Sequence, residues 1–178
     1  MNNLFFISGG PCTGKTSVIN ELKERGYNTI PEAARLVAEN DSRFKGKTIK
    51  EIDLKAFQNE IFSLQKRQTG SLIGKGGIYF SDRGFGDSLA YTRMANLDFP
   101  DYFFDYARKF RNSPVFILEP LEFYRTDELR TESPEEREVI HAEIIRAYEE
   151  LGHPIIRVPV MEKNERADFV LQKSLKGS

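Results

Sequence analysis

The sequence predicts a three-layer α/β domain in which helices cover both faces of a five-stranded parallel sheet. Short apolar runs alternate along the chain with longer amphipathic segments, which is typical of strands joined by helical crossovers. The chain has 178 residues, the length of one domain, and it can bury a core without disulfides or a structural metal. We therefore expect residues 1–178 to form a single domain.

The N-terminal half is expected to supply three of the strands. Apolar residues at helical spacing predict the helices, as Leu54, Phe57, Ile61 and Leu64 do for the longest of them. The polar residues 41–50 predict a mobile loop. The expected elements are a strand at 4–8, a helix at 14–25, a strand at 28–31, helices at 32–39 and 51–69, and a strand at 78–82.

The C-terminal half is expected to supply the other two strands. Its clearest signal is a helix start, with Ser133 as the N-cap, Pro134 in the first turn and Glu136 three residues after the cap. Gly152 marks the end of that helix. The expected elements are helices at 84–96 and 100–112, a strand at 114–118, a helix at 133–151, a strand at 154–158 and a helix at 164–175.

The composition excludes several classes of protein. Twenty-six Lys and Arg residues against 27 Asp and Glu residues give a net charge of −1, so we expect neither a nucleic-acid partner nor a polybasic membrane anchor. Cys12 is the only cysteine, which excludes an intrachain disulfide and a multi-cysteine zinc site. Since no apolar stretch approaches the ~20 residues of a membrane span, we expect a cytoplasmic protein.

Residues 9–16, Gly-Gly-Pro-Cys-Thr-Gly-Lys-Thr, match the pattern G-x-x-x-x-G-K-[ST] of a phosphate-binding loop, or P-loop. Glycines let successive N–H groups turn inward around phosphate oxygens, and the following helix presents its positive end to the same anion. Lys15 is expected to reach the β- and γ-phosphates of a nucleotide, and the Thr16 hydroxyl to bind Mg²⁺. The predicted nucleotide-binding residues are Gly9, Gly10, Pro11, Cys12, Thr13, Gly14, Lys15, Thr16 and Ser17.

Two alternatives accompany this motif. A glycine-rich turn between a strand and a helix can exist without any ligand. Cys12 is expected to act only as a small side chain whose backbone N–H faces phosphate. Because a helix N-terminus lowers the pKa of a thiol, a redox switch at Cys12 is the second interpretation.

Asp82 and Arg83 follow a predicted central strand and are expected to complete the site. Asp82 is the candidate carboxylate for nucleotide-bound Mg²⁺, directly or through water, and the alternative is an N-cap of the next helix. Arg83 is expected to place its guanidinium beside the transferring phosphoryl group or an acceptor phosphate. The alternative for Arg83 is a surface ion pair.

Glu32 lies where the second strand turns into a helix. Ligands of open parallel sheets bind at the carboxyl ends of the strands, so Glu32 can face an acceptor hydroxyl and take its proton. An equally weighted interpretation is a first-turn glutamate that favours the helix dipole. Arg35 can pair with Glu32, bind substrate or lie on the surface.

Arg125 and Arg130 lie in the polar stretch before the helix that Ser133 caps. Arginines on a closing loop can stabilise the charge that spreads over a γ-phosphate during transfer. Solvated surface arginines are the alternative.

Other conspicuous side chains are expected to be structural. His141 and His153 are given no catalytic role. Tyr102, Phe103, Tyr106 and Phe110 are expected in the core rather than as a platform for a base, and Gln58 and Gln65 on a solvated helix face, although both can reach an acceptor.

These motifs together resemble the small AAA-like, kinase-like P-loop NTPases, akin to the nicotinamide-riboside kinase domain of a bacterial NAD regulator and to nucleoside and nucleotide kinases. The resemblance covers nearly the whole chain. The matching segments are residues 9–16, Pro31-Glu32-Ala33-Ala34-Arg35, Asp82-Arg83-Gly84, Asp127-x-x-Arg130-x-Glu132, and Tyr148-x-x-Leu151-Gly152 leading to Val158-Pro159.

The resemblance implies a three-layer P-loop NTPase fold with strand order 2-3-1-4-5 and a lid at about 119–133 that carries Arg125 and Arg130. It makes Glu32 the candidate base and Arg83 an acceptor-side anchor. It also implies that Pro159 and Val160 lie near the nucleotide base. No established acceptor-base motif is recognisable, so the acceptor stays open.

The expected function is an ATP-dependent kinase that transfers the γ-phosphoryl group of ATP·Mg²⁺ to a small-molecule acceptor, with nucleosides and nucleotides as candidates. Lys15, Glu32, Asp82, Arg83 and Arg130 are its predicted catalytic residues. The alternative is a nucleotide-gated ATPase or GTP-binding module that recruits a protein or lipid partner with little turnover. GTP preference lacks its usual N/T-K-x-D motif. A ring-forming AAA machine is disfavoured because Arg83, rather than a second acid, follows the strand acid.

Overall fold

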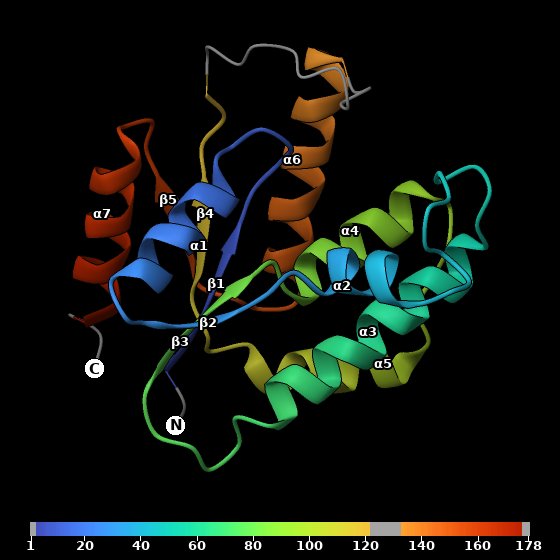
Figure 1. The fold of residues 1–178 in the computed structure, drawn as a ribbon, viewed down its shortest axis with the longest axis horizontal. Helices are drawn as coiled ribbons and strands as arrows, with labels where there is room; N and C mark the ends of the chain where they lie inside the picture. Colours follow the sequence, from blue (N-terminus) through green and yellow to red (C-terminus); the bar gives the residue numbers. More distant parts are fainter. Residues whose placement is uncertain (1–2, 122–132, 176–178) are drawn as a thin grey trace.

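The computed structural model describes residues 3–121 and 133–175, in which five parallel strands form one sheet (Figure 1). The strand order is β2-β3-β1-β4-β5, which confirms the expected topology. The elements are β1 (Asn3–Ser8), α1 (Lys15–Glu24), β2 (Asn28–Ile30), α2 (Ala33–Asn40), α3 (Leu54–Gly70), β3 (Ile78–Asp82), α4 (Phe85–Met94), α5 (Asp101–Ala107), the 3₁₀ helix η1 (Arg108–Phe110), β4 (Val115–Leu118), α6 (Pro134–Glu150), β5 (Ile155–Val158) and α7 (Lys163–Leu175).

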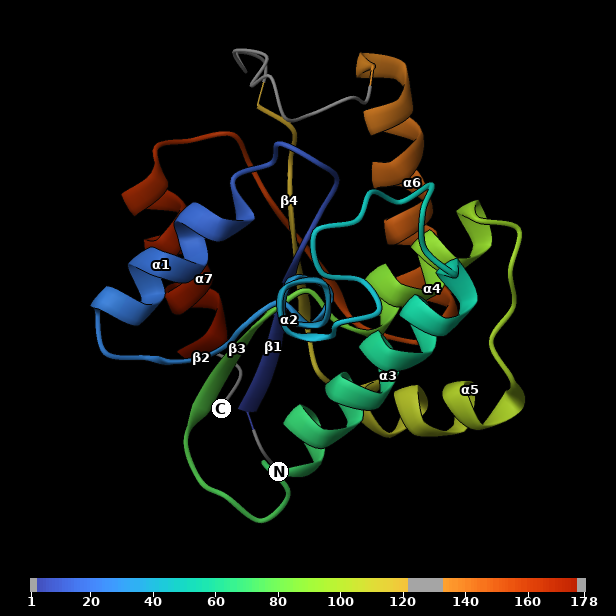
Figure 2. The ribbon, with the colours of Figure 1, turned by 45° about the vertical axis from the view of Figure 1, so that its right-hand side comes forward.

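Side chains of the central strand β1 alternate between two cores because successive residues of a strand point to opposite faces. Phe5 and Ile7 pack against α1 and α7, whereas Leu4 and Phe6 pack against the helices of the other face. The two helical layers lie on either side of the sheet (Figure 2). The P-loop that follows β1 therefore extends from a strand that is buried on both faces.

The helix boundaries follow local capping signals. The helix expected from residue 51 begins at Leu54 because the Asp53 side chain accepts a hydrogen bond from the Ala56 N–H at 3.0 Å. Ser133 and Glu136 form the expected capping box at the start of α6. The segment expected as one helix at 100–112 divides into α5 and η1.

Residues 41–50 are mostly exposed, as their polar composition predicts, but they contain one buried residue. Phe44 within them is buried, and its ring lies 5.1 Å from that of Phe57, centroid to centroid. Arg43 also pairs with Asp41 and with Glu60 of α3. This segment is therefore joined to α2 and α3 by one buried aromatic residue and to α3 by one ion pair.

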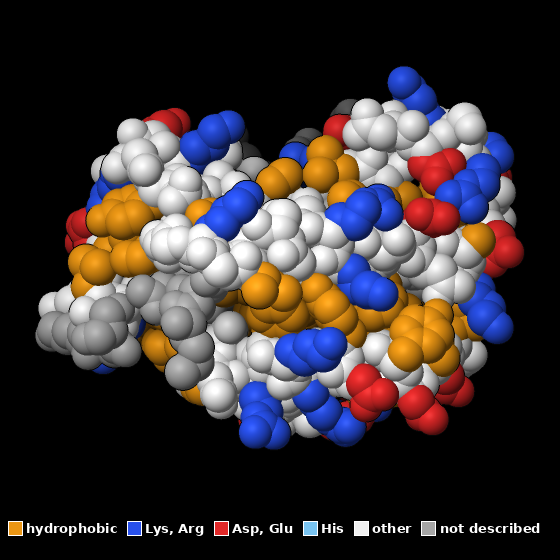
Figure 3. Space-filling view, turned by 90° about the horizontal axis from the view of Figure 1, so that it is seen from below, with side chains coloured by type: hydrophobic (Ala, Val, Ile, Leu, Met, Phe, Trp, Pro, Cys, Tyr) orange, Lys and Arg blue, Asp and Glu red, His pale blue; other side chains and the backbone are white. Residues whose placement is uncertain are grey.

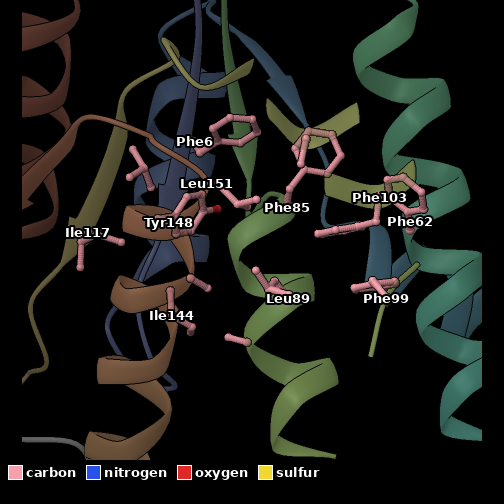
Figure 4. Packing of buried hydrophobic residues seen from close by; sticks show 14 of the residues in the cluster. Phe6, Phe62, Phe85, Leu89, Phe99, Phe103, Ile117, Ile144, Tyr148 and Leu151 are labelled. Carbon is pink, nitrogen blue, oxygen red and sulfur yellow. The ribbon is translucent and has the colours of Figure 1, made fainter. Parts of the chain in front are cut away.

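An aromatic cluster joins α3, α4 and α5 in the core (Figure 4). Phe103 is fully buried and stacks on Phe99 with ring centroids 4.0 Å apart. Tyr106 and Phe110 pack against this core as expected. Tyr102 is 58 % exposed, which contradicts its assignment to the core, although its ring lies 6.1 Å from that of Phe62.

Seen from below, the molecule carries a band of apolar side chains with Lys and Arg side chains on both sides (Figure 3). Lys66 of α3 and Lys109 of η1 both lie over the Tyr106 ring, at 5.4 and 5.2 Å from its centroid. The two ammonium groups therefore cover part of the exposed aromatic surface in cation–π contacts. Among the described residues, no helix is long and apolar enough to cross a membrane.

Candidate functional site

The P-loop connects Ser8 of β1 to Lys15 of α1 in a tightly curled conformation. Gly9 has a φ of +136°, and a Cβ atom there would lie 2.7 Å from the Leu118 carbonyl oxygen, so only glycine fits. Gly14 is the N-cap of α1 with a φ of 84°. Cys12 also has a positive φ, of 61°, and its side chain is buried. The loop thus has the local backbone shape that an anion nest requires.

Lys15 lies folded over the inside of the loop. Its Nζ donates hydrogen bonds to the Gly9 and Gly10 carbonyl oxygens at 2.8 and 2.6 Å. Burial is the largest cause that lowers the pKa of Lys15, to about 7, and the positive charge of Arg83 adds to it. Thr16 and Ser17, by contrast, are exposed at the start of α1. The loop therefore holds a buried amino group, and the first turn of α1 carries two exposed hydroxyl groups.

Two buried side chains from distant helices fix the loop. The Gly10 N–H donates to Nδ1 of His141 on α6 at 3.0 Å. Arg166 of α7 donates from Nη1 to the Thr13 carbonyl at 2.6 Å and from Nη2 to the Glu119 carbonyl at 3.1 Å. Sequence reasoning gave His141 only a general structural role and missed Arg166. A charged residue on the buried side of α7 was the available signal for Arg166.

Asp82 ends β3 beside Ile7 of β1 and is 8 % exposed. Burial, and then the negative charge of Glu32, raise the pKa of Asp82 to about 6. Its Oδ1 has no hydrogen-bond partner among the described residues. The N-cap of α4 is Gly84, so the alternative role of Asp82 as a helix cap is wrong.

Arg83 forms a half-buried ion pair with Glu32, with 2.8 Å between its Nε and Glu32 Oε1. Its Nη1 also lies 3.5 Å from Asp87 Oδ1 and 3.4 Å from Tyr91 Oη. Burial alone would lower the pKa of Arg83, but the Glu32 carboxylate and its neighbours raise it overall, so the guanidinium stays charged. Both side chains are only 18 % exposed, which excludes a surface ion pair. Arg35 is exposed, and Glu32 pairs with Arg83 instead.

Asp87 is a central residue of the site that sequence reasoning missed. Its carboxylate accepts hydrogen bonds from Ser8 Oγ at 2.8 Å, from the Gly84 N–H at 3.0 Å and from Tyr148 Oη at 2.7 Å. It therefore joins the end of β1, the start of α4 and the buried face of α6. An aspartate in the first turn of a helix is an ordinary capping signal, so the pattern gave no reason to expect this burial.

The close approach of Tyr148 to α4 depends on glycine. A Cβ atom at Gly86 would lie 2.4 Å from Tyr148 Cδ2, and one at Gly84 would lie 2.4 Å from Phe6 Cδ1. Figure 4 shows Tyr148 of α6 among the residues that pack against the start of α4. Burial, and then the Asp87 carboxylate, raise the pKa of Tyr148 well above its usual value, so its hydroxyl keeps the proton it donates.

A cavity of about 170 Å³ lies between α2, α3 and α4. Gln58 and Gln65 are buried in its wall, which contradicts their assignment to a solvated face. Gln65 donates to the Gly84 carbonyl and accepts from Ser88 Oγ, whereas Gln58 Oε1 has no hydrogen-bond partner among the described residues. The lining residues are Glu32, Ala33, Ala34, Ile49, Phe57, Gln58, Ile61, Gln65, Arg83, Asp87, Ser88 and Tyr91.

The remaining expectations fall outside this cluster or outside the described residues. Arg125 and Arg130, and most of the expected lid at about 119–133, lie in the part of the chain that the structure does not describe. Pro159 and Val160 follow β5 and are exposed. Within residues 3–121 and 133–175, no group of three or more acidic, histidine or cysteine side chains is arranged to hold a metal ion.

Comparisons with solved structures agree with this fold. Shikimate kinase from Acinetobacter baumannii in complex with shikimate is 16 % identical, with a TM-score of 0.57, and the match covers 99 % of this chain and 94 % of that one. Thymidylate kinase from Ehrlichia chaffeensis is 12 % identical, with a TM-score of 0.62, over 97 % and 98 % of the two chains. At these identities the likeness shows the fold.

A third similar structure is the NadR protein in complex with NR, which is 18 % identical with a TM-score of 0.70. The match covers 97 % of this chain but 52 % of NadR, so this chain spans about half of that protein. No curated protein has a sequence that matches this one. The family model described as "AAA domain" matches residues 4–166, which include the P-loop, Glu32, Asp82 and Arg166. This match covers most of the sequence, and we conclude that the chain belongs to the AAA domain family, with the fold of small P-loop kinases.

Proposed function

We propose that the protein is a phosphotransferase that moves the γ-phosphoryl group of ATP to a small-molecule acceptor. The observation that carries this proposal is the proximity of the P-loop lysine to the charged wall of the cavity. Besides burial, the charges of Arg83, Asp87, Asp82 and Glu32 all affect the pKa of Lys15. Asp87 of the cavity wall also accepts a hydrogen bond from Ser8, the residue before the P-loop. The phosphate-binding loop and the cavity therefore adjoin each other, as transfer between two bound substrates requires.

On the nucleotide side, the backbone of residues 9–17 binds the phosphates of ATP and Lys15 neutralises their charge. Pro159 and Val160 contribute to the surface around the base, and Arg125 and Arg130 stabilise the transferring group. The bound complex of NadR with NAD and AMP-PNP, on a chain with a TM-score of 0.68, supports an adenine nucleotide in this fold.

The residues present fit a magnesium ion that the nucleotide brings with it. Mg²⁺ is usually held by one or two carboxylates together with substrate phosphates rather than by an all-protein cage. Asp82 Oδ1 is buried and has no hydrogen-bond partner among the described residues, and the Thr16 hydroxyl is exposed. Both are oxygen ligands of the type that magnesium binds. When bound, the ion neutralises charge that develops on the phosphate oxygens.

On the acceptor side, Glu32 orients the attacking hydroxyl and takes its proton. Its pairing with Arg83 fixes the carboxylate at the wall of the cavity. Arg83 holds Glu32 in place and adds positive charge near the phosphoryl group. The hydrogen bonds of Asp87 with Ser8 and Tyr148 fix the position of this wall relative to the P-loop.

The test is acceptor-dependent consumption of ATP across nucleosides, nucleotides, nicotinamide riboside and shikimate, with product identified by mass spectrometry. Glu32→Gln is expected to reduce phosphoryl transfer at least a hundredfold while changing ATP affinity less than threefold. Glu39→Gln, an exposed residue on α2, is the matched control. Equal losses of transfer and ATP binding would remove Glu32 from the role of base.

Absence of turnover with every acceptor would contradict the phosphotransferase proposal. Partner binding that requires ATP or GTP while turnover stays at background would support the nucleotide-gated module instead.

A further inference from the structure

The cavity between α2, α3 and α4 has a charge pattern that restricts the acceptor, given the phosphotransferase function proposed above. We infer that the acceptor is a small uncharged compound with several hydroxyl groups, of nucleoside type, rather than a phosphate ester or a carboxylic acid. The volume of about 170 Å³ suits a compact molecule.

The charged side chains of the cavity wall favour an uncharged acceptor. Arg83 is the one cationic side chain among the described lining residues, and Glu32 and Asp87 are the two anionic ones. Arg83 already faces both carboxylates, at 2.8 Å from Glu32 and 3.5 Å from Asp87. An anionic acceptor would compete with these two carboxylates for Arg83 and lie beside two negative charges in a partly desolvated cavity. An uncharged acceptor leaves the ion pair intact.

The cavity wall offers a ligand hydrogen-bond acceptors, from Gln58 and from Glu32. Gln58 is 8 % exposed, and its Oε1 needs a donor that no described residue provides. A carboxylate oxygen of Glu32 likewise accepts hydrogen bonds. A hydroxyl group of the ligand donates to such atoms, whereas the charged group of a phosphate ester or of a carboxylic acid only accepts hydrogen bonds. The hydroxyl groups that such compounds also carry can still donate, so these acceptors favour a polyol, and the charge pattern favours one without an anionic group. The polar part of the cavity therefore matches a ligand with several O–H groups.

The cavity wall has an apolar part and a charged part. Phe57 and Ile61 of α3 and Ala33 of α2 supply apolar surface, while Arg83 and Asp87 form the end that is joined to the P-loop through Ser8. A ring can pack on the apolar part while a hydroxyl group points toward the phosphates. A nucleoside combines these two features in one small molecule.

The test compares adenosine, cytidine, uridine and thymidine, each with its own 5′-monophosphate, and includes shikimate as a carboxylic polyol. Binding is measured by calorimetry on the full chain, with and without AMP-PNP and Mg²⁺. We expect at least one nucleoside to bind at least tenfold more tightly than its monophosphate and than shikimate. Equal or tighter binding of the monophosphate or of shikimate overturns the inference, and so does the failure of all four nucleosides to bind.

Two variants test the reasons given. Glu32→Gln releases Arg83 from its partner, so the preference for nucleoside over monophosphate should fall at least fivefold, whereas the control Glu39→Gln should leave it unchanged. Gln58→Leu removes the open acceptor atom and should weaken nucleoside binding about tenfold without changing AMP-PNP affinity. An unchanged preference in Glu32→Gln overturns the charge argument and with it the inference.

The design separates this inference from the proposed function. If AMP-PNP does not bind, the proposed function is wrong, while acceptor titrations of the nucleotide-free protein still decide the substrate class. If a nucleoside binds selectively but receives no phosphoryl group from ATP, the inference is supported and the phosphotransferase proposal is contradicted.

Discussion

The N–H of Gly10 in the P-loop donates a hydrogen bond to Nδ1 of His141, 131 residues further along the chain, at 3.0 Å. His141 lies on α6 and Gly10 lies in the turn after β1. One buried hydrogen bond therefore links α6 to the P-loop. A Cβ atom at Gly10 would lie only 3.0 Å from that of His141, which shows how closely the two segments approach.

His141→Ala is expected to weaken ATP binding at least fivefold and to lower the free energy of unfolding by about 1–3 kcal/mol, because the buried Gly10 N–H loses its acceptor. Asparagine places an oxygen near the position of Nδ1, so His141→Asn should restore most of both quantities. Calorimetric titration and denaturant unfolding measure the two effects.

His153 supplies the control for this experiment. It is also buried, but its Nδ1 contacts the Ser113 carbonyl at 2.9 Å, away from the loop. His153→Ala should destabilise the protein and leave ATP affinity within twofold. A similar loss of ATP affinity in both alanine variants would show that His141 does not position the loop.

ATP binding is expected to take up a proton at Lys15. Burial, and then Arg83, lower the pKa of this ammonium group in the free protein to about 7, and a bound polyphosphate restores the charge. ATP affinity should therefore fall up to about tenfold per pH unit between pH 7.5 and 9. Calorimetry in buffers of different ionisation enthalpy gives the proton count directly. Lys15→Ala should abolish turnover and remove this dependence, whereas Lys23→Ala, an exposed residue on α1, should not.

The same pKa predicts the stability of the nucleotide-free protein. Lys15 has a lower pKa in the folded chain, about 7, than its ordinary value of 10.5. The unfolded chain therefore binds more protons between these values, so stability should rise with pH from about 7 to 10. A flat unfolding free energy in this range, or a proton uptake near zero on ATP binding, would contradict the assignment.

Asp82→Asn is expected to stabilise the nucleotide-free protein. Burial, and then Glu32, raise the pKa of Asp82 from 3.8 to about 6, so this carboxyl group lowers stability as the pH rises from about 4 to 6. Since one pH unit of pKa change corresponds to about 1.4 kcal/mol, removal of the charge at pH 7 stabilises by up to about 3 kcal/mol. Denaturant unfolding of both proteins at pH 4 and pH 7 measures the difference, which should be small at pH 4.

The functional consequence of Asp82→Asn should have the opposite sign. The amide that replaces the carboxylate is a weaker ligand for a hard cation, so the magnesium concentration required for half-maximal ATP turnover should rise at least tenfold. An unchanged magnesium requirement in Asp82→Asn would place the functional carboxylate elsewhere.

Gly86→Ala is expected to destabilise the protein by about 3 kcal/mol or more, because the added Cβ atom would lie 2.4 Å from the Tyr148 ring. Gly76→Ala is the matched control, since a Cβ atom at that position would meet no other atom within 4 Å. Tyr148→Phe removes the hydroxyl that donates to Asp87 and should cost about 1.5–3 kcal/mol. Chemical denaturation separates the three variants, and equal stability of the two alanine variants would contradict the tight contact.

Much of the fold was predictable because its signals are local. The alternation of apolar runs and amphipathic segments gave the strands and helices, and the capping box at Ser133 and Glu136 gave the start of α6. The P-loop was predictable because its chemistry depends on glycines and a lysine at fixed spacing, and this spacing can be read directly from the sequence. The left-handed φ values of Gly9 and Gly14 agree with that pattern.

Tertiary structure alone decided which distant side chains meet. Asp87 is a surface cap by its local pattern, yet the approach of α6 and β1 buries it with Tyr148 and Ser8. Gln58 and Arg166 have polar character that predicts a solvated helix face, yet helix packing turns both inward. The sequence by itself determined the strands of the sheet, the P-loop and the types of side chain that can surround the P-loop. The crossing of helices over that sheet decided their partners, because burial and contact depend on residues far apart in the chain.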